Sequence, residues 1–339
     1  MTAAEIQTVD YHTGGEPFRI FTGDLPFEAT TVAARRVEAI HSEPIDRLRK
    51  VLCFEPRGHA DMYGGFVVPP DDDGAAFGVL FWHKDGYSTA CGHGTIALGA
   101  WAVESGLVDT HPSGITDVSI DVPSGRVVAR VHSKLERVSR VEFLNVASYP
   151  IDLAVPVATT RGDVIVSVSC SGAIYAQVRA SDLGLAVEPR YLTELIALGR
   201  EIKHSLSGTE AARHPEDERL GGIYGVIFWD DLGTDSQGRL HQRNVTVFAD
   251  GEVDRSPCGS GTGSRLATLT AEGSLEIGAE LVHDSIVGSR FIASVSGVEE
   301  MPWGARAYLP IVSGTTYLTG RHSFVVDPDD PLLPGFVLR

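Results

Sequence analysis

Two short segments, each with a cysteine followed by small residues, are the parts of the sequence best suited to chemistry. The first reads ACGHGTIALGAWAVESG over 90–106, and the second reads PCGSGTGSRLATLTAEG over 257–273. Both contain Cys-Gly-x-Gly-Thr, and both end on a glycine at the same distance from the cysteine. The two cysteines, Cys91 and Cys258, lie about half the chain apart. This spacing indicates two similar halves, each of which supplies one thiol.

The small residues after each cysteine predict a sharp turn into a helix. A cysteine at such a helix start lies beside unpaired N–H groups and the positive end of the helix dipole. These surroundings lower the pKa of a thiol, and the same N–H groups can bind a carboxylate. One motif alone is consistent with either a nucleophile or an anion-binding site.

Two opposed thiols suit the inversion of a carbon centre. One thiolate removes a proton from one face of the carbon, and the other thiol delivers a proton to the opposite face. Each sulfur should lie about 3–3.5 Å from the reacting carbon, so the sulfurs should stand roughly 6–7 Å apart. The alternative is that both are core cysteines in glycine-rich turns. Cys53 and Cys170 lack the motif, and we expect both to lie in core strands.

Short apolar runs bounded by Gly, Pro, Asp or Ser predict a chain rich in strands. The predicted strands are Arg19–Thr22, Gly65–Val68, Gly78–Trp82, Val118–Val122, Arg126–His132, Val141–Val146, Val164–Ser169 and Gly225–Phe228. Helices are predicted in smaller number. They are Thr31–Ile40, a helix starting near Arg47–Val51, Gly94–Glu104, Tyr191–His204 and Gly261–Glu272.

The repeated motif and the length of 339 residues predict two lobes. We place residues 1–150 and 320–339 in the first lobe, with Cys91, and residues 151–319 in the second, with Cys258. The stretch Tyr149–Arg161, which contains Pro150 and Pro156, is the expected crossover between them.

Composition narrows the class of protein. With 28 basic and 45 acidic residues the formal charge is −17, which disfavours nucleic acid as a partner. No apolar run is long enough for a membrane span, and the start of the chain does not resemble a signal peptide. Four widely spaced cysteines without a CxxC pair indicate free thiols in a reducing cytoplasm and no zinc site. GSGTG at 259–263 lacks the spacing of a dinucleotide-binding loop.

The two motifs and their surroundings resemble the proline racemase family, which includes hydroxyproline epimerases and trans-3-hydroxyproline dehydratases. The similarity is spread over most of the chain. It is carried by DYHTGGEPFRI at 10–20, GHADMYGG at 58–65, GYSTACGHGTIALG at 86–99 and DGEVDRSPCGSGTG at 250–263. The paired motifs CGHGT and DRSPCGSGT are far more specific than a single glycine-rich loop.

The resemblance implies an α/β fold like that of diaminopimelate epimerase: two pseudo-symmetric lobes, each a curved mixed sheet wrapped around a central helix. It implies a small cyclic amino acid bound between the lobes, without a cofactor or a metal. We expect no nucleic acid or membrane as a partner, and a homodimer as the default assembly.

Transferred residue by residue, the resemblance makes Cys91 and Cys258 the acid/base pair. It implies that the substrate carboxylate binds the backbone N–H groups of four residues: Gly92, His93, Gly259 and Ser260. Asp254 would accept a hydrogen bond from the ring ammonium, and His93 would add a polar contact. Phe248 and Tyr63 would pack on the pyrrolidine ring. Asp254 could instead only cap its turn, and His93 could be a buried helix-start residue.

Two positions depart from the family pattern. Ser260 stands where the family usually has Thr, although its backbone donor is retained, and Tyr63 stands where a proline racemase has Phe. The hydroxyl of Tyr63 favours a hydroxylated proline as substrate. Family dehydratases usually carry Thr at the position of Cys258, so its presence favours two-base epimerisation. The segments DYHTGGEP and DMYGG are more typical of the dehydratase branch, so water loss from 3-hydroxyproline remains the alternative, as does an inactive binding protein.

Overall fold

The computed structural model describes residues 4–135 and 137–338, and the chain divides into two units. The first unit comprises Met1–Val141 and Thr315–Arg339, and the second comprises Glu142–Gly314. The boundaries expected from the sequence, at 150 and 319, instead lie inside strands β9 (Tyr149–Thr159) and β18 (Thr316–Val326).

The expected crossover at Tyr149–Arg161 is therefore wrong. This segment is almost entirely β9, which pairs antiparallel with the strand that follows it. Pro150 and Pro156 lie opposite Ser169 and Ile165 without ending the strand. A proline is compatible with a strand wherever its missing N–H would face away from the neighbouring strand, so these prolines do not mark a linker.

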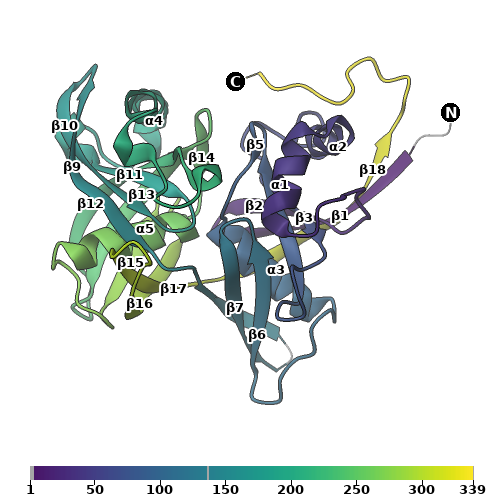
Figure 1. The fold of residues 1–339 in the computed structure, drawn as a ribbon, viewed down its shortest axis with the longest axis horizontal. Coiled ribbons are helices and arrows are strands. Elements are labelled where there is room, and N and C mark those ends of the chain that lie inside the picture. The colour runs from purple at the N-terminus through teal and green to yellow at the C-terminus, as the bar shows by residue number, and fades with distance from the viewer. Residues whose placement is uncertain (1–3, 136, 339) are drawn as a thin grey trace. The chain divides into compact units, whose positions relative to one another are not determined.

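The first unit combines a mixed sheet with three helices (Figure 1). Its strands are β1 (Ala4–Thr13), β2 (Glu16–Phe21), β3 (Gly64–Val68), β4 (Phe77–His83), β5 (Gly86–Tyr87), β6 (Ile115–Val122), β7 (Gly125–Lys134) and β18. Its helices are α1 (Val32–His41), α2 (Glu43–Cys53) and α3 (Gly92–Glu104). Strand β8 (Arg137–Leu144) contains the boundary between the units.

The second unit has the same kinds of element. Its strands are β9, β10 (Gly162–Cys170), β11 (Ile174–Arg179), β12 (Ile223–Thr234), β13 (Leu240–Phe248), β14 (Glu252–Asp254), β15 (Glu280–Ser285), β16 (Arg290–Glu300) and β17 (Arg306–Gly314). Its longer helices are α4 (Leu192–Leu206) and α5 (Gly259–Ala271). Short 3-10 helices lie at Ala180–Leu183, Pro189–Tyr191, Glu210–Ala212 and Glu218–Leu220.

The strands of the two units follow the same order of pairing. In the first unit β1 pairs antiparallel with β18 and β2, β2 runs parallel to β3, β3 and β4 are antiparallel, and β4 runs parallel to β6. In the second unit β10 pairs antiparallel with β9 and β11, β11 runs parallel to β12, β12 and β13 are antiparallel, and β13 runs parallel to β15. The expected pseudo-symmetry of the two halves is confirmed at the level of topology.

A buried helix lies at equivalent places in the two units. The first eleven residues of both α3 and α5 are buried, and each helix packs on several strands of its own unit. Gly106 and Gly273, the matching glycines of the two motifs, both have φ 74° and end the helices in the left-handed conformation. The repeated motif thus encodes both the start and the end of a central helix.

The remaining helices pack elsewhere on each sheet. Helices α1 and α2 share an apolar core with β3 and β4 that includes Val32, Leu52, Phe66 and Trp82. In the second unit α4 packs on β12 and β13. Among the described residues, no helix combines the length and the apolar composition that crossing a bilayer requires.

The five predicted helices are confirmed, with small shifts of their ends. The prediction for Cys53 is wrong in part, because this residue is buried but ends helix α2 and does not lie in a strand. The reason is the spacing of the buried side chains: Ile45, Arg49 and Leu52 recur every three or four residues, as on one face of a helix. Cys170 is buried at the end of β10, as expected.

Candidate active site

Cys91 begins the central helix of the first unit. Its backbone is extended, with φ −155°, and its Sγ accepts a hydrogen bond from the Gly94 N–H at 3.2 Å. Its carbonyl accepts from the Thr95 N–H at 3.0 Å and from the Thr95 hydroxyl at 2.8 Å. Cys91 therefore acts as the N-cap residue of α3 and points its sulfur at the free amides of the first turn.

His93 lies against the sulfur of Cys91. The Cys91 Sγ is 3.5 Å from His93 Nδ1 and 3.6 Å from Nε2, and the His93 carbonyl accepts from the Thr13 hydroxyl at 3.0 Å. The His93 ring is buried edge-on against Tyr63, with the ring centres 5.0 Å apart. The imidazole is thus close enough to exchange a proton with the Cys91 thiol.

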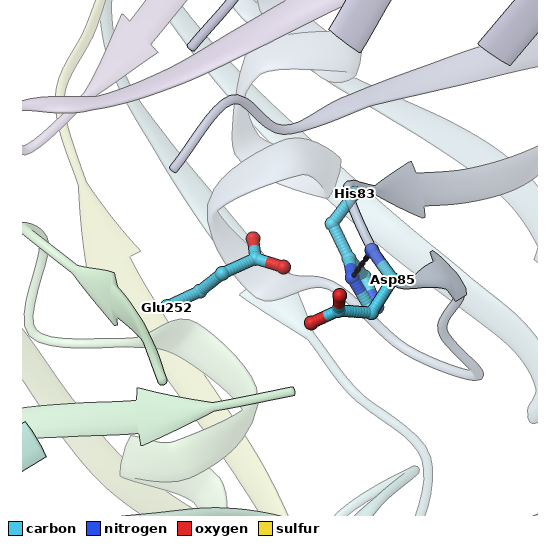
Figure 2. Close-up of side chains that lie close together, drawn as sticks. All are labelled: His83, Asp85 and Glu252. Carbon is cyan, nitrogen blue, oxygen red and sulfur yellow. Dashed lines mark hydrogen bonds between the residues drawn. The ribbon is translucent and has the colours of Figure 1, made fainter. Parts of the chain in front are cut away.

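Tyr63 is buried beside His93, and its hydroxyl forms a short hydrogen bond with the Ser88 hydroxyl. Its ring also lies 5.7 Å from the ring of His83, whose Nδ1 accepts from the Asp85 N–H at 3.2 Å. Figure 2 draws this last bond as a dashed line; Glu252, also shown there, belongs to β14 of the second unit. The first unit therefore gathers Cys91, His93 and Tyr63 in one polar and aromatic cluster.

Cys258 begins the central helix of the second unit in a similar way. Its Sγ accepts from the Gly261 N–H at 3.3 Å, and its carbonyl accepts from the Thr262 N–H at 2.7 Å. Its backbone differs from that of Cys91, because φ is 61°, in the left-handed region that few residues other than glycine adopt.

The electrostatic surroundings of Cys258 differ from the expectation for a helix start. Burial, and then the negative charge of Asp254, raise the pKa of the Cys258 thiol well above its ordinary value, although the Gly261 N–H opposes the shift. The expected lowering by the helix start is therefore outweighed here. The shift favours the thiol form of Cys258, a form that can donate a proton.

Asp254 and Ser256 shape the turn before Cys258. The Asp254 carboxylate accepts from the Ser256 N–H at 2.8 Å and from the Ser256 hydroxyl at 2.7 Å, and the Ser256 Oγ accepts from the Cys258 N–H at 3.1 Å. Asp254 thus does cap this turn, one of the two roles considered for it. Through Ser256 the cap also reaches the backbone N–H of Cys258.

The first-turn residues expected to bind a carboxylate are buried in both units. Gly92 and His93 open α3, and Gly259 and Ser260 open α5, where backbone N–H groups have no carbonyl one turn earlier. The Ser260 hydroxyl is buried, and it has no hydrogen-bond partner among the described residues. A buried hydroxyl without a partner is costly, so a bound polar group at this position would stabilise the site.

Phe248 belongs to an aromatic series in the second unit. Its ring stacks on Tyr224 at 5.7 Å, and Tyr224 lies edge-on to Tyr175, also at 5.7 Å. Tyr175 and Ile227 form an apolar cluster with Cys258. The second unit therefore gathers Cys258 with Asp254, Ser260 and an aromatic wall that includes Phe248.

Several neighbours of the cysteines escaped the sequence analysis. Ser256 lies within the DRSPC segment, where a serine two residues before a cysteine is a readable turn signal. Tyr224, Tyr175, Ser88 and His83 stand alone in ordinary strand or turn sequence. Only the topology of each sheet brings them to the cysteines.

The fold and the paired cysteines define a class of two-unit α/β proteins in which each unit presents a thiol at the start of its central helix. The chain belongs to the proline racemase family, whose model, described as "Proline racemase", matches residues 8–337. This family consists of enzymes that include epimerases and dehydratases of hydroxyproline, and the chain is an enzyme of this family.

The chain is similar to named relatives over almost its whole length. It is 42% identical to a 3-hydroxyproline 2-epimerase of Burkholderia multivorans, over 98% of both chains. It is 41% identical to a trans-3-hydroxy-L-proline dehydratase of Bacillus cereus, over 98% of this chain and 97% of the relative. A crystal structure of a hydroxyproline epimerase from Agrobacterium vitis, with bound trans-4-hydroxy-L-proline, matches with a TM-score of 0.88 and 28% identity. That match covers 98% of this chain and 96% of the other.

Proposed function

We propose that this enzyme inverts the α-carbon of a hydroxylated proline by acid/base chemistry of two cysteines, without a cofactor. The observation that carries the proposal is the shared capping geometry, in which Cys91 and Cys258 each accept a hydrogen bond from the amide three residues later, at 3.2 and 3.3 Å. A 3-hydroxyproline is the favoured substrate, since relatives that are 41–42% identical are named for it. The reaction belongs in a reducing cytoplasm, where the four cysteines, none of which forms a disulfide, stay reduced.

In the proposed reaction the two cysteines have different starting roles. Cys258, kept as a thiol by burial and by Asp254, donates its proton to the α-carbon. Cys91, whose proton can move to His93 3.5 Å away, removes the α-proton from the other face. The C–H bond of the substrate becomes the S–H bond of Cys91, and the S–H bond of Cys258 becomes the new C–H bond. The reverse reaction exchanges these roles.

The substrate's other groups are assigned to the remaining residues. The carboxylate binds the first-turn amides of Gly92, His93, Gly259 and Ser260, which also stabilise the charge that develops as the carbon loses its proton. The buried Ser260 hydroxyl supports this assignment, since it has no partner among the described residues. Asp254 accepts from the ring ammonium, and Tyr63 and Phe248 pack on the ring.

A second candidate is the dehydration of trans-3-hydroxy-L-proline, which is favoured by the names of several relatives that are 40–42% identical. Here one cysteine removes the α-proton, the C3–O bond breaks, and the departing hydroxide takes that proton from the cysteine and leaves as water. The resulting enamine rearranges to a cyclic ketimine. Only one base is required, so Cys258→Thr should abolish epimerisation and retain this water loss.

The test is a deuterium-exchange assay in D₂O with L-proline, trans-4-hydroxy-L-proline and trans-3-hydroxy-L-proline. Products are separated by chiral chromatography, and any ketimine is reduced with borohydride to proline. Epimerisation should incorporate deuterium at the α-carbon, and Cys91→Ser and Cys258→Ser should each reduce its rate by about 10²- to 10⁴-fold.

Cys53→Ser is the matched control. The Cys53 thiol donates a hydrogen bond to the Met62 carbonyl at 3.4 Å, and a serine hydroxyl can make the same contact. The epimerisation rate of Cys53→Ser should equal that of the unmodified enzyme. Full epimerisation by either Cys91→Ser or Cys258→Ser would contradict the two-cysteine mechanism.

A further inference from the structure

The turn at Cys258 has a conformation that needs support. Cys258 has φ 61°, whereas Cys91 at the equivalent position has φ −155°. The left-handed region is sterically unfavourable for a residue with a side chain, which persists there only where its surroundings hold it. The Ser256 hydroxyl of the Asp254–Ser256 cap accepts a hydrogen bond from the Cys258 N–H. The carbonyl on the other side of that peptide bond, from Pro257, needs other partners.

The carbonyl of Pro257, directly before Cys258, is held by two side chains. It accepts a hydrogen bond from Asn244 Nδ2 at 3.0 Å and another from the Thr262 hydroxyl at 3.0 Å. Asn244 and Thr262 are both fully buried, so these bonds are shielded from water.

His283 joins these two side chains. Its Nε2 lies 2.7 Å from Asn244 Nδ2, and its Nδ1 lies 2.9 Å from the Thr262 hydroxyl. These contacts form a closed ring of hydrogen bonds if the His283 proton is on Nδ1. Asn244 then donates to His283 Nε2, and His283 Nδ1 donates to the Thr262 hydroxyl. Asn244 and Thr262 each also donate to the Pro257 carbonyl. Only a neutral imidazole satisfies this ring, and burial lowers the pKa of His283 to about 3.

The ring ties the cysteine turn to the centre of the sheet. Asn244 lies on β13 and His283 on the parallel neighbour β15, while Thr262 lies in the first turn of α5. The equivalent threonine of the first unit, Thr95, donates to the Cys91 carbonyl at 2.8 Å. The extended turn at Cys91 is thus held by a local hydrogen bond from Thr95. The left-handed turn at Cys258 is held by the ring of hydrogen bonds among Asn244, His283 and Thr262, which we call the brace.

We propose that His283 is a positioning residue which, through Asn244 and Thr262, holds the Pro257–Cys258 peptide in the left-handed turn that aims the Cys258 thiol. The catalytic part of this inference rests on the proposed function of Cys258. The structural part does not, and it can be measured without turnover.

The test compares two isosteric variants on the same helix. Thr262→Val removes the hydroxyl that links His283 to the Pro257 carbonyl. Thr268→Val removes an equally buried hydroxyl of α5, one that contacts Ser169 at 2.7 Å and not the cysteine turn. Any general cost of a valine in α5 therefore appears in both variants.

Two measurements are made on each variant. The first is kcat and KM for epimerisation, where Thr262→Val should lower kcat by about 10- to 100-fold and change KM by less than about threefold. The second is the rate of iodoacetamide labelling of Cys258 relative to Cys91, followed by mass spectrometry. This ratio should rise by about threefold or more in Thr262→Val, because the buried thiol is no longer held.

Thr268→Val should leave both measurements unchanged, and Thr262→Ser, which keeps the hydroxyl, should restore them. His283→Leu removes both ring nitrogens at a similar volume, and it replaces Thr262→Val if the valine variant fails to fold; its labelling ratio should also rise. A labelling ratio no higher than that of Thr268→Val overturns the proposal. If the unmodified enzyme shows no α-hydrogen exchange, the proposed function fails, while the labelling ratio still decides whether the brace exists.

Discussion

At the scale of residues, the two cysteines of one repeated motif have different surroundings. Cys91 lies 3.5 Å from an imidazole, and Cys258 lies near a carboxylate that, together with burial, raises the pKa of its thiol. A raised pKa in the folded state favours folding below the ordinary thiol pKa, and this contribution is lost as the pH rises through the folded-state pKa. Asp254 therefore affects protonation as well as the shape of the turn.

Asp254→Asn tests this effect. Asparagine can still accept from Ser256 but carries no charge, so the pKa of Cys258 should fall and its thiolate fraction at pH 8 should rise by about threefold to tenfold. The measurement is the pH dependence of iodoacetamide labelling at Cys258, with Cys91 as the internal control. An unchanged pH profile at Cys258 would show that the carboxylate does not set this pKa.

At the level of single residues, the sequence predicted the site residues that belong to the repeated cysteine motif or lie close to it. Cys91 and Cys258 stand out because two unlinked segments share one motif, and His93 and Asp254 lie within a few residues of them. Asn244 and His283 could not be identified in this way. Each is one of several polar residues in its strand, so nothing in the local sequence singles it out, and only the parallel pairing of β13 with β15 places them together.

At the scale of elements, the glycines of the motif allow the sulfur to reach the helix amides. A Cβ added at Gly94 would lie 2.8 Å from Cys91 Sγ and would also collide with the Phe18 ring. At Gly261 the added atom would lie 2.9 Å from Cys258 Sγ. These positions must stay without a side chain for the cysteine to cap the helix.

Gly94→Ala should therefore displace Cys91 or Phe18, which lowers turnover and reduces the free energy of unfolding by about 1–3 kcal/mol. Urea unfolding and the epimerisation rate measure the two effects. Gly297→Ala in β16 is the control, since an added Cβ there meets only Leu309 at an ordinary 3.4 Å. Equal stability and turnover in the two variants would refute this account of the glycine.

Helix and strand types were largely predictable from the sequence, because apolar spacing and turn residues mark them locally. The division into units was harder to predict. Pro150 and Pro156 resemble a linker, and only the pairing of β9 with β10 shows that they lie in a strand. Cys53 was misread for a similar reason, since the short apolar run Val51–Phe54 does not reveal the helical face formed by Ile45, Arg49 and Leu52.

At the scale of the whole molecule, the first unit is built from both ends of the chain. Strand β18 pairs with β1 along its length, from Ala4 opposite Val326 to Thr13 opposite Thr316, and the Phe324 ring lies 4.4 Å from the guanidinium of Arg19. The second unit, Glu142–Gly314, is a continuous segment. The two units thus depend differently on the last residues of the chain.

A chain that ends after Gly314 should lose the structure of the first unit and keep that of the second. Removal of β18 leaves β1 with an unpaired edge and exposes apolar surface, which favours local unfolding and proteolysis. Limited trypsin digestion followed by mass spectrometry should yield a protected fragment that begins near residue 142. Equal protection of both units in the shortened chain would contradict this dependence.

The discontinuous first unit also affects biosynthesis. The ribosome releases the segment that completes the second unit before it releases β18, so the half that is made first can finish folding only last. At ordinary elongation rates the amino-terminal segment would wait about 10–40 s for its closing strand. During that interval the open edge of β1 is a natural binding site for chaperones, and a premature stop codon at or before Thr316 would leave that edge without its partner strand.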